Sequence, residues 1–263
     1  MAKTGNTVAY GSMRPRFRAY IGIDYSGAGC PDKPQKGLQI YEAHESHAAR
    51  RIGPETGSNW SRTGVYEYLR VRLSSTDPII VGIDHSFSFP KPYMDQYGLT
   101  TWEQFLDDFS NHWPTDKFPV GTLHRDNERT GDPDWFRLTE RWTQGAKSVF
   151  RFGVPGQVAY SSHAGIPWLH RLRKEFQGKV HFWPFDGFDP APDKTLIAEV
   201  YPALYRGRVE LTASTRDEQD AEAVATWLHD CDQDGILDRY FNPPLSEKNR
   251  DLVGLEGWIL GLS

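Results

Sequence analysis

The stretch Ile-Ile-Val-Gly-Ile-Asp at residues 79–84 decides the fold, because an almost unbroken apolar run of this length is typical of a strand buried on both faces. Such strands lie at the centre of parallel sheets that carry helices on both sides. An earlier stretch, Tyr-Ile-Gly-Ile-Asp at residues 20–24, has the same form and also ends in an acid. The two stretches predict two core strands of an α/β protein.

Hydrophobic spacing on either side of these stretches predicts further elements. Three shorter strands are expected, at residues 37–44, 48–52 and 195–200. Apolar residues recur at helical spacing over residues 63–74 and again over residues 216–230. Thr215 and Glu218 mark the start of the second helix as a capping box, in which the two side chains bond to free backbone amides.

A long segment of different composition separates the fourth and fifth expected strands, at about residues 90–193. It holds many prolines and six of the nine tryptophans, and its helical spacing lies near residues 102–113, 134–142 and 167–176. Because it begins and ends within one sheet, we expect an insertion into a single domain over residues 18–263, preceded by a flexible arm at 1–17. The expected fold class is α/β, with a mixed five-stranded sheet, flanking helices and a long helical insertion.

Composition narrows the class of protein. The 30 basic and 35 acidic residues give a net charge of −5, which argues against non-specific, charge-driven binding of nucleic acid. The longest apolar run, residues 79–83, is about a quarter of the roughly 20 residues that cross a bilayer. Neither a membrane helix nor a secretory leader is expected, and two cysteines are too few for a disulfide framework. We therefore expect a cytoplasmic protein.

Three acids lie at or near the ends of expected strands. Asp24 and Asp84 each follow an apolar run, at the carboxyl end of a strand, where open α/β sheets bind their ligands. Glu199 lies within the strand expected at residues 195–200, where a charge is unfavourable unless another group compensates it.

Two further acids, Asp217 and Asp220, lie three residues apart and so share one face of the expected helix. Apolar side chains continue that face, which turns the two carboxylates toward the core. Carboxylates that converge repel one another unless a cation neutralises them, and hard oxygen ligands suit Mg²⁺ or Mn²⁺. Two such ions roughly 4 Å apart would activate water against a phosphodiester.

Each acid also has a simpler explanation. Asp24 and Asp84 are suited to capping turns, and Asp217 to stabilising the first turn of a helix through its dipole. An ion pair with an arginine explains Glu199 and Asp220 as well as a metal does.

The order of strands, helices and acids resembles the ribonuclease H-like fold. More narrowly, five short motifs resemble the family called domain of unknown function 429, whose members are predicted ribonuclease H-like nucleases. The motifs are Ile-Gly-Ile-Asp24, Val-Gly-Ile-Asp84, Ala-Glu199-Val-Tyr-Pro202, Asp217-Glu-Gln-Asp220-Ala-Glu-Ala and Glu256-Gly-Trp-Ile-Leu.

This resemblance spans about residues 18–262 and implies a function for the acids. Asp24, Asp84, Glu199 and Asp220 would be the catalytic, metal-binding residues, with Asp217 as an additional metal ligand. The implied activity is metal-dependent hydrolysis of a nucleic acid, DNA or RNA, without an organic cofactor. The insertion is much longer than the single helix that ribonuclease H has at this place, so the resemblance leaves the substrate open.

Two other functions remain open. Sugar kinases and related ATPases share the core strand order and place an acid after the first strand, so phosphoryl transfer is one alternative. The other is a catalytically silent protein that grips a partner with its tryptophan-rich insertion. That hypothesis predicts arginines paired with Glu199 and Asp220.

Overall fold

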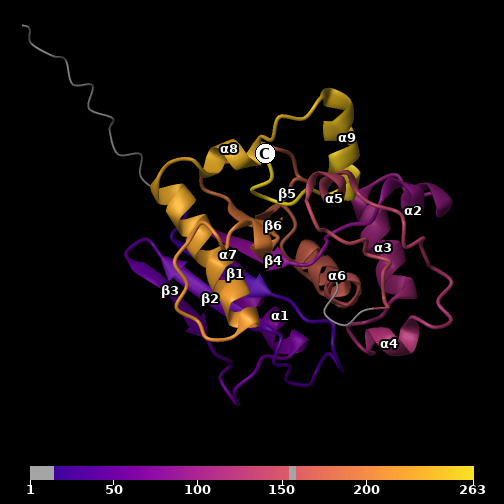
Figure 1. Cartoon of the computed structure of the whole chain (residues 1–263), viewed down its shortest axis with the longest axis horizontal. Helices are drawn as coiled ribbons and strands as arrows, with labels where there is room; N and C mark the ends of the chain where they lie inside the picture. The colour runs from indigo at the N-terminus through magenta and orange to yellow at the C-terminus, as the bar shows by residue number, and fades with distance from the viewer. Residues whose placement is uncertain (1–14, 154–157) are drawn as a thin grey trace, which may run out of the picture.

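The computed structural model describes residues 15–153 and 158–263, and its centre is one mixed sheet with the strand order β3-β2-β1-β4-β6-β5 (Figure 1). The strands are β1 (Ala19–Asp24), β2 (Gln39–His44), β3 (His47–Ile52), β4 (Ile79–Asp84), β5 (Val180–Trp183) and β6 (Thr195–Glu199). The first three strands are antiparallel neighbours, whereas β4, β6 and β5 run parallel to β1. Edge strand β3 has its side chains largely exposed.

Helices cover both faces of the sheet. They are α1 (Arg62–Leu73), α2 (Lys91–Gln96), α3 (Trp102–His112), α4 (Val120–Leu123), α5 (Leu138–Trp142), α6 (Val158–Glu175), the 3-10 helix η1 (Pro202–Leu204), α7 (Arg216–Gln233), α8 (Leu237–Phe241) and α9 (Glu247–Glu256). Figure 1 shows α7 crossing β1 and β2, with the helices of the inserted segment gathered at one side.

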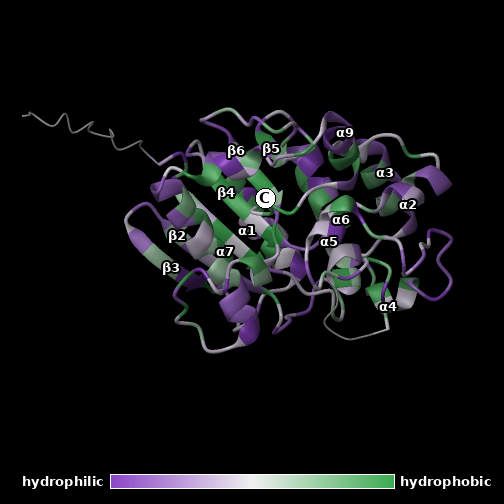
Figure 2. Cartoon of the chain, turned by 45° about the horizontal axis from the view of Figure 1, so that its top comes forward, coloured by the Kyte–Doolittle hydropathy of each residue, from purple (hydrophilic) through white to green (hydrophobic). Residues whose placement is uncertain are grey.

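Alternating side chains of the central strands enter two different apolar clusters. Ile21 and Val81 pack with residues of α1 and α6, whereas Tyr20 and Ile80 pack with α7 on the opposite face. The first cluster also contains aromatic residues of the insertion, such as Trp102, so the insertion shares the core of the sheet. Figure 2 shows hydrophobic residues concentrated on the central strands and hydrophilic ones on the outer loops.

The expected α/β class, the five expected strands and the helices at residues 63–74 and 216–230 are confirmed, with ends that shift by one to three residues. The capping box of Thr215 and Glu218 is present. The strand count was wrong, because the insertion contributes a sixth strand, β5, which pairs with β6 at the edge. Four residues are too few to reveal a periodicity, so this strand could not be told from a loop.

The helix expected at residues 167–176 extends further toward the amino terminus, since α6 covers Val158–Glu175 of the described residues and contains Pro167. Proline removes the amide that would bond to the carbonyl four residues before it, which normally breaks a helix. Here that carbonyl belongs to His163, and the buried Thr115 hydroxyl donates to it at 2.5 Å. A contact from the α3–α4 segment thus replaces the missing bond.

The amino-terminal arm expected at residues 1–17 lies mostly outside the described residues. Phe17, within that range, is fully buried, and its backbone N–H donates to Asp232 at 2.9 Å. Within residues 15–153 and 158–263, no helix combines the length and the hydropathy needed to cross a membrane.

Two glycines allow α7 to lie directly on the sheet. A Cβ on Gly22 would lie 2.2 Å from the carbonyl oxygen of Ala221, and one on Gly82 would lie 2.6 Å from the Val224 side chain. Because the first obstacle is helix backbone, a side chain on Gly22 would push the whole helix away.

We therefore predict that Gly22→Ala lowers the free energy of unfolding by about 2 to 3 kcal/mol, as overpacked cores do. Gly53→Ala is the matched control, since nothing lies within 4 Å of its Cβ position. Urea unfolding of the two variants measures the difference. Equal stability would show that α7 does not press on the sheet at Gly22.

Candidate functional site

The carboxyl ends of β1 and β4 place two carboxylates side by side. The strands are parallel and in register, so Asp24 pairs directly with Asp84. Side chains alternate along a strand, and both acids therefore project toward the face of Gly22 and Gly82, which α7 covers. The structure brings these two predicted site residues together.

The amino-terminal turn of α7 adds Asp217 and Asp220 to this pair. Thr215 caps the helix, and its side chain accepts from the backbone N–H of Glu218. Asp217 reaches the loop after β1, because one of its oxygens lies 3.6 Å from the position of a Cβ on Gly37. The positive end of the helix dipole favours acids at this turn, although it cannot neutralise four of them.

Electrostatics show that the pair on the strands is short of positive charge. The pKa of Asp24 is raised well above its usual value by burial, then by the charges of Asp84, Asp217 and Asp220. The pKa of Asp84 is likewise raised well above its usual value by burial, then by Asp220 and Glu199. Within the described residues, no hydrogen bond donor reaches either carboxylate.

Among the residues that the structure describes, no hydrogen bond donor reaches the Asp217 carboxylate either. Its pKa is raised by burial, then by Asp220 and Glu218. Free, partly accessible carboxylates with raised pKa values are typical of functional sites.

Asp220 differs from these three acids because it is paired with a base. The Arg206 guanidinium donates to Asp220, and the more exposed Arg216 lies 3.5 Å from its other oxygen. An ion pair with arginine, one of the two explanations open for Asp220, is confirmed.

Glu199 does not join the other acids. It pairs in register with Ile83, the neighbour of Asp84, so its side chain projects to the opposite face of the sheet. There it accepts two hydrogen bonds from Arg137, at 2.8 and 2.6 Å, and one from the backbone N–H of Phe87 at 3.1 Å. Glu199 is therefore held by an arginine as well.

Arg137 was not recognised from the sequence. Its guanidinium is buried and also donates to Glu140 at 2.9 Å, to Ser86 at 2.9 Å and to the backbone carbonyl of Glu256 at 3.1 Å. No spacing rule connects residues 62 positions apart, so the charge of Glu199 was the only signal that a partner exists.

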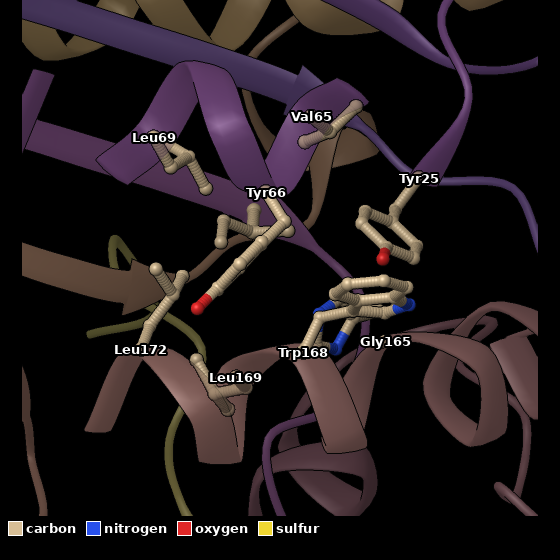
Figure 3. Close-up of a pocket in the computed structure, with 10 residues that line it drawn as sticks. Tyr25, Val65, Tyr66, Leu69, Gly165, Trp168, Leu169 and Leu172 are labelled. Atoms are coloured by element: carbon tan, nitrogen blue, oxygen red, sulfur yellow. The ribbon is translucent and has the colours of Figure 1, made fainter. Parts of the chain in front are cut away.

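Two hollows lie near these elements. A cavity of about 10 Å³, room for about one water, lies among Tyr25, Tyr66 and Trp168 on the far face of the strand ends (Figure 3). A cleft of about 690 Å³ lies between the β2–β3 hairpin and α7, lined by residues that include His47, Arg208 and His229. None of the predicted site acids lines either hollow.

The donor set at the strand ends suits a hard divalent cation. Within residues 15–153 and 158–263, no three His, Cys, Asp or Glu side chains are arranged to hold a metal as they lie. Mg²⁺, however, commonly uses one or two carboxylates and keeps several waters. The Asp24 and Asp84 pair fits that pattern, whereas Glu199 and Asp220 are engaged by arginines.

Comparison with protein-family models, curated proteins and solved structures found no match. The function must therefore be argued from the site.

We predict that Asp84→Asn stabilises the metal-free protein at pH 7 by about 1 to 2 kcal/mol, because it removes a partly buried charge that repels Asp24. A raised native pKa means that the native state binds the proton more tightly than the unfolded chain does, so stability falls as pH rises from 3.8 through the native pKa. The gain should therefore shrink as the pH falls toward 4. Urea unfolding in EDTA from pH 4 to 8 tests this, with exposed Asp193→Asn as the control. A loss of stability at pH 7 would contradict the repulsion.

We also predict that Glu199→Gln lowers the free energy of unfolding by about 3 to 5 kcal/mol, because it leaves the buried Arg137 charge undercompensated. Glu103→Gln, which breaks an exposed pair with Arg173, should cost less than about 1 kcal/mol. Denaturant unfolding compares the two variants. If both variants lost similarly little stability, the ion pair between Arg137 and Glu199 would not be important for the stability of the fold.

Proposed function

We propose that this protein is a divalent-metal-dependent phosphodiesterase that acts on nucleic acid. The observation that carries the proposal is the register of β1 and β4, which aligns two partly buried carboxylates without hydrogen bond donors. The two carboxylates repel each other, and a hard cation bound between them would stabilise both.

The arrangement of the sheet supports a ribonuclease H-like fold. Three antiparallel strands are followed by a helix and by β4, which joins β1 in parallel. Acids stand at the ends of the first and fourth strands, as in the family called domain of unknown function 429, which the sequence resembles. Strand β5 extends this core at one edge.

In this proposal Asp24 and Asp84 hold one ion. A divalent cation there would supply the positive charge that a phosphodiester requires when water attacks it. Asp217 lies at the same site with a free carboxylate, and its raised pKa suits it to accept the proton of the attacking water. A second ion, as the sequence led us to expect, requires Asp220 to exchange Arg206 for the metal.

One specific observation favours a second candidate, a binding protein without catalysis. That hypothesis predicts arginines paired with Glu199 and Asp220, and both pairs are present. The free acids Asp24, Asp84 and Asp217 favour the hydrolase, because a site that has lost its metal has no reason to retain them.

We predict that the purified protein cleaves DNA or RNA when Mn²⁺ or Mg²⁺ is added, and that Asp24→Asn lowers the rate at least about 100-fold, as the loss of a direct ligand should exceed that of an outer partner. Labelled single strands, duplexes and hybrids should be tested separately. Asp193→Asn is the control and should retain full activity. Cleavage that survives Asp24→Asn would place the activity elsewhere, and a wild type that neither binds metal nor cleaves would favour the binding protein.

A further inference from the structure

Arg206 is placed at the acidic site by a rigid segment. It follows η1, and its backbone N–H donates to the carbonyl of Pro202 at 3.1 Å. The preceding residue, Tyr205, is fully buried and stacks on Trp227 of α7, with ring centroids 4.2 Å apart. The base of the Arg206 side chain is therefore fixed relative to α7.

The Arg206 guanidinium serves more than one carboxylate. It donates to Asp220, and the pair is mostly but not fully buried, with 21% of the Arg206 side chain and 15% of the Asp220 side chain exposed. Its charge also lowers the pKa of both Asp24 and Asp84, against the repulsion that raises them. Arg206 is thus a shared counter-ion for Asp24, Asp84 and Asp220.

A divalent cation bound at Asp24 and Asp84 would lie close to the positive charge of the Arg206 guanidinium. Like charges at short range in a partly buried site repel strongly, since solvent screens them less than at a surface. A metal that recruits Asp220 must also break the Arg206 hydrogen bond. Because the guanidinium is partly exposed, it can turn into solvent while its backbone stays in place.

We infer that Arg206 is a built-in counter-ion that competes with the divalent cation for the acids of this site, so that it limits metal affinity and Asp220 becomes a ligand only when Arg206 leaves. The inference rests on the proposed function for the presence of the metal. It adds a residue that regulates the site and that the sequence motifs did not include.

The test is a calorimetric titration of the full-length protein with Mn²⁺. Arg206→Gln should bind Mn²⁺ about tenfold more tightly than wild type, a change of the size that one partly buried ion pair can cause. Arg208→Gln is the matched control, because it removes the same charge two residues away, from an exposed side chain that lines the cleft between the β2–β3 hairpin and α7. Arg206→Lys, which keeps the charge, should return the affinity toward that of wild type.

Thermal unfolding gives a second readout. In EDTA, Arg206→Gln should unfold at a lower temperature than Arg208→Gln, because the acids have lost their counter-ion. Added Mn²⁺ should then raise the midpoint of Arg206→Gln more than that of wild type. A purely structural role for Arg206 would instead weaken metal binding, since a distorted site binds less well.

The outcomes separate the two proposals. Unchanged or weaker Mn²⁺ binding by Arg206→Gln overturns the counter-ion role, even if wild type cleaves nucleic acid. Tighter binding by Arg206→Gln without cleavage by any variant supports the counter-ion role and overturns the hydrolase. An absence of Mn²⁺ binding by both wild type and Arg206→Gln overturns both.

Discussion

The alignment of two parallel strands forces Asp24 and Asp84 against each other, and the surrounding site is organised around that repulsion. Two carboxylates on adjacent strand ends cannot both ionise at low cost inside a protein. The chain adds Asp217 and Asp220 from α7 and only partly offsets them with Arg206. A fold selected for stability alone would place apolar residues at these positions. The excess of negative charge is therefore best understood as a feature of function.

The sequence was most informative where a long local pattern coincided with the final packing. Residues 79–84 form a buried central strand as expected, and the Thr215 capping box marks the start of α7. Short elements were not predictable, since β5 has only four residues. The start of α6 was misplaced because the partner that tolerates Pro167 is a hydroxyl about 50 residues away. Local patterns cannot contain such distant contacts.

Because local patterns do not contain distant contacts, only part of the candidate site could be predicted from the sequence. The proximity of four acids could be predicted, because the ends of strands and the faces of helices can be recognised in the sequence. These acids are Asp24, Asp84, Asp217 and Asp220. Glu199 was grouped with them, although the register of β6 turns its side chain to the other face. A shift of one residue in register decides which face a strand residue occupies, and hydrophobic pattern does not fix it for a strand buried on both sides. Arg137 then connects Glu199 to the insertion and to the α9 end, which ties three distant parts of the chain together.

The exposed strand β3 has a consequence for how copies of this protein behave at high concentration. An unpaired strand at the border of a sheet can template the addition of another chain, which leads to aggregates. The outermost strand here carries Arg50 and Arg51, and positive side chains of this kind deter a second strand from docking. The basic residues of β3 thus protect the molecule against self-association along its open side.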